Sequence, residues 1–203
     1  TALLLFLLAC TSLKAQLRLP AIFNDHMVIQ QNASVPIWGW TNPSQHVTIN
    51  VSWDTTTIKT RADHGTFWKT AIKTPSAGGP HSITIKSGGE VVALEDVLSG
   101  EVWIASGQSN MEWSMNAAAD GKPLIEKVND PNIRLFHIPK SSAGTLQVRG
   151  EGEWKVCNKE TVSGFSAVAY FFGKKLNENL NEPVGLINAS WGGSPAEVWL
   201  SEE

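Results

Sequence analysis

The chain has 203 residues, of which 16 are Lys or Arg and 19 are Asp or Glu, so its formal net charge is −3 at pH 7. Hydrophobic residues make up 42% of the sequence, which excludes an intrinsically disordered chain and allows one or two globular domains. The mildly acidic balance, without runs of Lys or Arg, also argues against a nucleic-acid-binding protein.

An apolar segment opens the chain. Residues 1–9 read TALLLFLLA, and small or polar residues follow in CTSLKAQ, which is the order of the apolar and cleavage regions of a secretory signal peptide. The run is much shorter than the ~20 residues that a membrane-spanning helix needs. We therefore predict a signal peptide over residues 1–16, cleaved after Ala15 or Gln16, and a secreted or periplasmic protein. Because the chain starts with Thr1 and has no basic region before the apolar run, we expect its start to be truncated.

The two cysteines leave one alternative open. Leu7-Leu8-Ala9-Cys10 resembles a bacterial lipoprotein box, in which Cys10 would be lipidated and become the mature N-terminus. Plain secretion is favoured, because little linker separates Cys10 from the patterned region that begins at Leu17. Cys157 then has no predicted partner, so no disulfide is expected even in an oxidising compartment.

Residues 17–98 consist of short segments with a period of two, typical of β-strands. Val47, Ile49, Val51 and Trp53 alternate with polar residues, and turn signals rich in Gly, Pro, Asn and Asp separate the segments. No stretch of a dozen residues shows a helical stripe. We therefore predict a β-sandwich domain over residues 17–98.

Residues 99–203 have a different pattern, in which strands alternate with a helix. Short buried-type strands are expected at 101–106, 133–138 and 184–189, and a helix at 166–180, with Ser163 or Ser166 as its N-cap. This alternation favours a parallel sheet covered by helices. An open α/β domain usually has more than the three strands predicted here. We therefore expect the sheet to be incomplete at the C-terminal end. The predicted apolar face of the helix comprises Val168, Phe171, Phe172 and Leu176.

The strongest local motif is Gly107-Gln108-Ser109-Asn110-Met111, directly after the strand at 101–106. Functional groups collect beyond the carboxyl ends of strands in open α/β sheets, and a serine in such a turn is exposed. The pattern G-x-S-x-M differs from the G-x-S-x-G elbow of α/β-hydrolases. Ser109 is thus a candidate nucleophile, and the alternative is an ordinary turn with a capping serine.

A second motif follows the strand at 184–189, in Asn188-Ala189-Ser190-Trp191-Gly192-Gly193-Ser194-Pro195. Adjacent glycines let a backbone N–H approach a ligand closely, as an oxyanion donor must. Gly192 and Gly193 are therefore candidate oxyanion donors. The alternative is a turn that needs glycine for its backbone conformation alone.

Several segments of the sequence together resemble a known family, in which similar segments occur in the same order. They are LRLPAIFNDHMVIQQ, VPIWGW, EDVLSGEVWIASGQSNMEW and VGLINASWGGSPAEVW. From about Leu17 to Glu203 the chain resembles the sialate O-acetylesterase branch of the SGNH hydrolases, carbohydrate esterases that remove acetyl groups from sugars. The resemblance implies a β-sandwich leading into a three-layer α/β/α domain. It also implies that Ser109 is the nucleophile, through an acetyl-serine intermediate, and that a glycine N–H at 192–193 joins the Ser109 N–H in an oxyanion hole.

The sequence departs from the family pattern at two motifs. It lacks the Gly-Glu-Ser-Asn motif that completes the oxyanion hole and the Asp-x-His or Asp-x-x-His segment that supplies the acid and base. His26 follows Asp25 but lies in the predicted sandwich, where a turn histidine is expected. His137 is expected at a strand end, and His46, His64 and His81 on the surface. We therefore expect this 203-residue chain to be essentially inactive alone, because the His/Asp pair is missing.

The predicted partner is an acetylated carbohydrate, with O-acetylated sialic acid as the first choice and acetylated xylan or pectin as the second. Gln108, Asn110 and Trp191 are candidate substrate-binding residues, and for Trp191 core packing is an equal alternative. For Trp103 core packing is expected outright. A non-catalytic carbohydrate-binding protein is the alternative from another functional class. No metal-ligand spacing and no phosphate-binding loop occur in the sequence, so no cofactor is predicted, and nothing in it indicates an oligomeric state.

Overall fold

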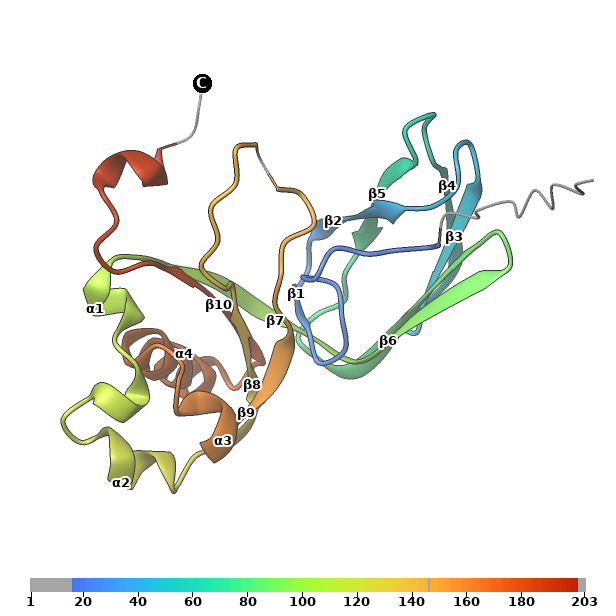
Figure 1. Ribbon diagram of the computed structural model, residues 1–203. Coiled ribbons are helices and arrows are strands. Elements are labelled where there is room, and N and C mark those ends of the chain that lie inside the picture. Colours follow the sequence, from blue (N-terminus) through green and yellow to red (C-terminus); the bar gives the residue numbers. More distant parts are fainter. Residues whose placement is uncertain (1–15, 146, 201–203) are drawn as a thin grey trace, which may run out of the picture.

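The computed structural model describes residues 16–145 and 147–200, which form two sheets and a group of short helices (Figure 1). One sheet has eight strands in the order β4-β3-β6-β7-β10-β8-β9, with β1 paired to β7, and the other consists of β2 and β5. The strands are β1 (Val28–Gln30), β2 (Ser34–Trp40), β3 (His46–Val51), β4 (Asp54–Arg61), β5 (Phe67–Lys73), β6 (Gly78–Ser87), β7 (Glu90–Gly107), β8 (Asn129–His137), β9 (Trp154–Asn158) and β10 (Val184–Ser190). The helices are α1 (Ser109–Glu112), α2 (Gly121–Ile125), α3 (Lys159–Val162) and α4 (Ala167–Leu180), with 3-10 turns η1 (Met115–Ala117) and η2 (Ala196–Trp199).

The first half of the described chain is built from strands, as the two-residue period predicts; their pairings are antiparallel except that β1 pairs parallel with β7. Val47, Ile49 and Val51 of β3 are buried, and their neighbours in the strand are more exposed. They share one apolar core with Ile83 and Ile85 of β6. Trp68 and Ile72 of β5 join the same core from the second sheet, so β2 and β5 pack against the larger sheet.

One long strand, β7, links the two halves of the molecule. Its first part pairs antiparallel with β6, and its last part, Glu101–Gly107, pairs parallel with β10. Asp96, with φ of +53°, lies within the pairing with β6, where the register shifts between Leu94 and Val97. β7 runs without a break through residues 98 and 99 and belongs to one continuous sheet. The strand therefore does not mark the predicted boundary at 98/99, and both this boundary and the sandwich domain over residues 17–98 stay predictions.

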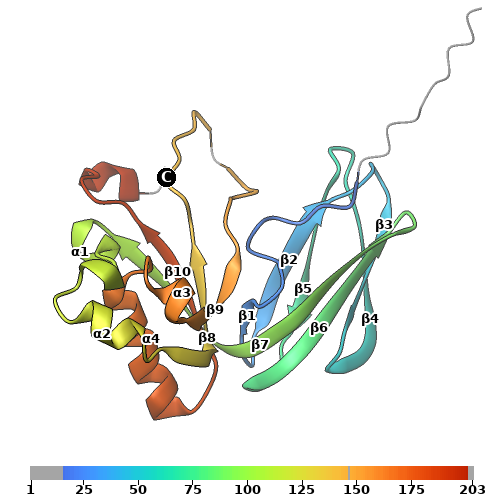
Figure 2. The same cartoon turned by 60° about the horizontal axis from the view of Figure 1, so that its bottom comes forward.

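The second half confirms the expected parallel strands and adds an antiparallel one. β10 lies between β7 and β8 and is parallel to both, whereas β9, which the sequence pattern did not reveal, pairs antiparallel with β8. The sheet is therefore mixed. Figure 2 shows the helices on the side of β8 and β10 that faces away from β2 and β5.

Alternate residues of β8 enter two different cores, because successive side chains of a strand point to opposite faces. Ile133 and Leu135 pack in the core beneath the helices, and Phe136 packs with Trp154 in the core of the first half. The rings of Phe136 and Trp154 are 5.3 Å apart. In the described chain the first half thus covers this part of the sheet, on the face opposite the helices.

Helix α4 begins as predicted, because Ser166 is its N-cap and the hydroxyl accepts a hydrogen bond from the Ala169 N–H at 3.1 Å. The predicted buried face is wrong for three of its four residues. Val168, Phe171 and Phe172 are 49%, 44% and 42% exposed, and only Leu176 packs against the core.

The reason is that α4 docks by Gly173, two alanines and one aromatic side chain, that of Tyr170. A Cβ atom on Gly173 would lie 2.6 Å from Leu186 Cδ1 of β10, so any larger residue here would force the buried Leu186 side chain or the helix to shift. Ala167, Ala169 and Tyr170 lie on the same buried face. The larger apolar residues consequently face outward, where the Phe172 ring meets Trp103 at 5.1 Å. Trp103 is 44% exposed, so the expectation that it is a core residue is also wrong.

A charged cluster connects the two halves near Asp96. Asp96 accepts hydrogen bonds from the buried Arg134 of β8, at 3.2 Å for Nη2, and lies 2.7 Å from His26 Nδ1. His26 has a φ of +66°, and it is indeed a turn histidine, but a carboxylate rather than the backbone contacts its ring. The guanidinium of Arg134, and secondarily His26, hold the pKa of Asp96 below its usual value.

Cys157 is buried and free of any disulfide in the described chain, and burial raises the pKa of its thiol to about 12. Cys10 and most of the predicted signal peptide lie outside the described residues. None of the helices over residues 16–145 and 147–200 is long and apolar enough to cross a membrane.

We expect Tyr170→Ala to lower the free energy of unfolding by about 3–5 kcal/mol, because it empties a buried site and removes the hydrogen bond from the Tyr170 hydroxyl to Asp130. Phe171→Ala, the neighbouring matched change on the exposed face, should cost about 1 kcal/mol or less. Urea unfolding of both variants measures the difference. Equal losses would contradict the burial pattern of α4.

We also expect the stability that Asp96 contributes to be lost in acid. Its folded-state pKa lies below the unfolded value of about 3.8, so this contribution is fully present above that value and disappears as the pH falls through the folded-state pKa. Asp96→Asn should therefore destabilise the protein at pH 7, by about 1–3 kcal/mol, since it leaves the Arg134 charge buried without its partner. Its unfolding free energy should approach that of the wild type below pH 3. A constant difference from pH 7 to pH 3 would refute this assignment.

Candidate active site

The carboxyl ends of three parallel strands meet at one edge of the sheet. Ser190 at the end of β10 pairs with Gly107 at the end of β7, and Asn188 pairs with His137 at the end of β8. Beyond the last ladder pair, the Trp191 N–H still donates to the Gly107 carbonyl at 2.9 Å. The two motifs singled out in the sequence, 107–111 and 188–195, therefore lie side by side.

Ser109 is the first residue of helix α1, a single turn that starts where β7 ends. Gly107, with φ of +137°, makes the turn out of the strand, a conformation that glycine adopts far more readily than other residues. Ser109 lines an open hollow of about 530 Å³ together with Gln108, Asn110 and Met111. This location exposes the serine to a ligand, as expected for a nucleophile.

Gly192 lies directly against Ser109. A Cβ atom built on Gly192 would be 3.3 Å from Ser109 Oγ and 3.5 Å from Ser109 Cα. Gly193 has a φ of +77° and open space where its Cβ would be. The structure thus brings Ser109 and Gly192 together, and places Gly193 at the next position of the turn, where glycine suits the backbone.

The turn that carries these glycines is fixed by hydrogen bonds at both ends. The buried Asn188 accepts from the Ser190 hydroxyl at 2.6 Å and from the Ser190 N–H at 3.1 Å. The Ser194 hydroxyl donates to the Trp191 carbonyl at 2.6 Å. Gln108, a candidate for substrate binding, donates its side-chain N–H to the Ser194 carbonyl, so it connects the nucleophile turn to the glycine turn.

A cavity of about 760 Å³ adjoins the glycine turn, between η2 and the loop that follows β8. Its lining includes Gly193, Trp191 and Trp199, and both indoles are 38% exposed. The Trp199 indole N–H donates to Ser194 Oγ at 3.0 Å, which orients that ring. Asn110 instead lines the hollow around Ser109, so the structure divides the predicted substrate-binding residues between two adjacent depressions.

Glu112 is a residue at this site that sequence reasoning missed. Its carboxylate accepts a hydrogen bond from the Gly192 N–H and another from Lys140 Nζ. These two bonds, that from Lys140 first, hold the pKa of Glu112 below its usual value. The available signal was its position three residues after Ser109, which places both side chains on one face of a helical turn.

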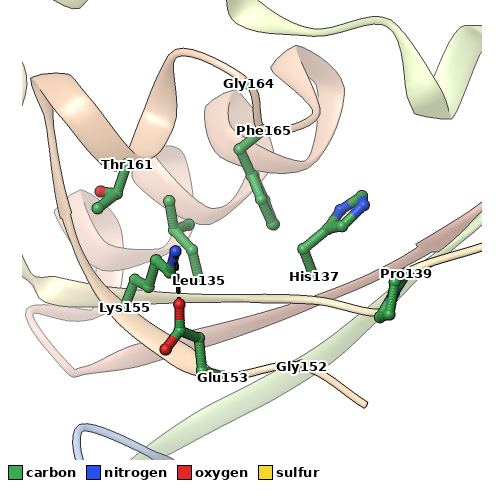
Figure 3. Close-up of a pocket in the computed structure, with 9 residues that line it drawn as sticks. All are labelled: Leu135, His137, Pro139, Gly152, Glu153, Lys155, Thr161, Gly164 and Phe165. Carbon is green, nitrogen blue, oxygen red and sulfur yellow. Dashed lines mark ion pairs between the residues drawn. The ribbon is translucent and has the colours of Figure 1, made fainter. Parts of the chain in front are cut away.

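No histidine of the described chain hydrogen-bonds to Ser109. His137 lies at the same edge of the sheet and contributes to the lowered pKa of Glu112. It also lines a separate hollow of about 280 Å³, which Figure 3 shows with Phe165, Leu135 and the Glu153–Lys155 ion pair. None of the predicted site residues lines that hollow. No cluster of His, Cys, Asp or Glu suited to a metal occurs among residues 16–145 and 147–200.

Comparison with known proteins finds relatives that are named as esterases. The chain is similar to the sialate O-acetylesterases of Pongo abelii and Homo sapiens, each 30% identical over 91% of this chain and 39% of the relative. It is also similar to the crystal structure of a carbohydrate acetylesterase from Xanthomonas citri, with 35% identity and a TM-score of 0.87 over 92% of this chain and 43% of that one. Both likenesses support the resemblance to the sialate O-acetylesterases that the sequence motifs indicate.

The chain spans about two fifths of the length of these relatives. No family model matches the chain.

Proposed function

We propose that this chain carries the nucleophile half of a serine esterase that removes O-acetyl groups from carbohydrate. The observation that carries the proposal is the packing of Ser109 Oγ against Gly192, where two parallel strands end. A nucleophile next to a backbone N–H that can face a developing oxyanion is the arrangement that acyl transfer requires. The family relationship to proteins named as acetylesterases supports the same chemistry.

In the proposed reaction Ser109 Oγ attacks the acetyl carbonyl and gives a tetrahedral intermediate. The N–H groups of Ser109 and of Gly192 or Gly193 stabilise its oxyanion. The intermediate collapses to acetyl-Ser109, and the sugar hydroxyl leaves with the proton that the serine gave up. A water molecule then hydrolyses the acetyl-serine, releasing acetate and restoring the serine.

Ser109 needs a base to accept its proton, and a carboxylate to orient that base. The family resemblance assigns this role to a histidine in an Asp-x-His segment, which this sequence does not contain. We therefore infer that the 203-residue chain is essentially inactive alone, and that activity requires a protein that also supplies the base.

The proposed substrate is an O-acetylated sialic acid, with acetylated xylan or pectin as the other candidates of the same chemistry. The cavity beside Trp191 and Trp199 is large enough for a sugar ring, and two half-exposed indoles offer faces on which such a ring stacks. The exported location expected from the apolar residues 1–9 belongs to the same proposal.

We expect a longer gene product that contains this chain and an Asp-x-His segment to hydrolyse p-nitrophenyl acetate and to react with a fluorophosphonate probe at Ser109. Ser109→Ala should lower kcat/KM by about 10³-fold or more, because the nucleophile is lost. Ser76→Ala, which changes an exposed serine of the first half, is the matched control and should leave the rate unchanged. A natively folded protein with neither hydrolysis nor labelling would refute the esterase and favour the carbohydrate-binding alternative.

We further expect acetylated sialic acid to quench tryptophan fluorescence, and Trp191→Ala to reduce this quenching by more than half. The reason is that Trp191 lines the cavity next to the proposed oxyanion donors. Trp53→Ala, in the first half, is the control for the loss of one indole. Quenching that survives both in Trp191→Ala and in Trp199→Ala, the other indole of the cavity, would assign the sugar to another surface.

A further inference from the structure

The Gly192 N–H, a proposed oxyanion donor, already has an acceptor in this structure. Glu112 Oε2 accepts its hydrogen bond. A backbone amide has a single proton, so Gly192 cannot donate fully to Glu112 and to a substrate oxygen together. Glu112 and the substrate therefore compete for the same donor.

The position of this carboxylate oxygen relative to Ser109 is the key geometric fact. A Cβ atom on Gly192 would lie 2.6 Å from Glu112 Oε2 and 3.3 Å from Ser109 Oγ, so both oxygens are within 3.3 Å of the same point. An oxyanion formed by attack of Ser109 must also lie close to Ser109 and to its amide donor. The Glu112 carboxylate thus occupies the region where that oxyanion would form.

A negative carboxylate and a developing oxyanion repel each other when they share one donor. The carboxylate must therefore leave the Gly192 N–H before the acetyl carbonyl can use it. The Glu112 side chain is 33% exposed, so it has room to move away. Lys140, a residue on the loop after β8 whose side chain is 39% exposed, holds the other carboxylate oxygen and opposes this movement.

We propose that Glu112 is a positioning residue that occupies the oxyanion site of the free protein and yields it to the acetyl oxygen of the substrate, with Lys140 as the anchor of the carboxylate. This inference rests on the proposed esterase function, in which Gly192 is an oxyanion donor. It goes further by naming a built-in competitor for that donor. Acetate, the product of the proposed reaction, should compete with Glu112 in the same way.

The test measures acetate binding through the ¹H–¹⁵N resonance of Gly192, which does not depend on catalysis. We expect Glu112→Ala to tighten the acetate dissociation constant by about tenfold, since it removes a charged acceptor from the amide. Glu112→Gln keeps the shape without the charge and should give a smaller gain. Glu197→Ala, which removes the same charge from the neighbouring turn η2, is the matched control and should change the constant less than twofold.

Lys140→Ala separates the proposal from its main competitor, in which the freed lysine simply attracts acetate. Loss of the anchor should tighten acetate binding at Gly192 several-fold if Glu112 is a displaceable occupant. Weaker acetate binding in Lys140→Ala, or equal acetate dissociation constants for Glu112→Ala and Glu197→Ala, would overturn the proposal. Glu112 would then be a structural residue that stabilises the glycine turn and is not displaced. Thermal unfolding of each variant confirms that the compared proteins are folded.

Kinetics of the longer, active protein distinguish failure of this inference from failure of the proposed function. With the inference correct, Glu112→Ala lowers KM for p-nitrophenyl acetate without lowering kcat. Ser109-dependent hydrolysis with unchanged acetate binding in Glu112→Ala would refute only the role of Glu112. Tighter acetate binding without any Ser109-dependent hydrolysis would refute the esterase and leave Glu112 as the occupant of an anion-binding amide.

Discussion

The pairing of β10 between β7 and β8 is the constraint on which the candidate site depends. All three strands are parallel, so their carboxyl ends open on one edge of the sheet. The ladder is in register up to Ser190 and Gly107, and the Trp191 N–H extends it by one further hydrogen bond. Two segments some eighty residues apart are thereby held within contact distance, and the glycine turn starts beside the nucleophile turn.

The same sheet separates two apolar cores, and this division explains the helix packing. β8 sends Leu135 toward the helices and Phe136 toward the first half of the chain. Because one face of the described sheet is already covered in part by the first half, α4 packs on the other face, and it does so through Gly173, two alanines and Tyr170. The consequence is an outward apolar surface that includes Phe171, Phe172 and Trp103.

Charge at the site is arranged around the glycine turn. Lys140 and the Gly192 N–H both donate to Glu112, and this explains why the pKa of that carboxyl is low. A carboxylate that stays ionised is a strong acceptor, so it keeps the amide occupied in the free protein. The same amide is the donor that the proposed reaction needs, which connects the electrostatics of the free site directly to its chemistry.

The sequence by itself determined the local features: the two-residue period of β3, the apolar strand segments in the last part of β7 and in β8 and β10, the Ser166 cap, and the two motifs that carry Ser109 and Gly192. Each depends on neighbouring residues only, so periodicity and turn chemistry reveal it. Only the tertiary structure decided which face of α4 is buried, because close approach to Leu186 favoured Gly173 over the larger apolar stripe. It alone also decided that β9 runs antiparallel and that Glu112 reaches Gly192, since strand pairing and a contact across 80 residues depend on how distant segments come together.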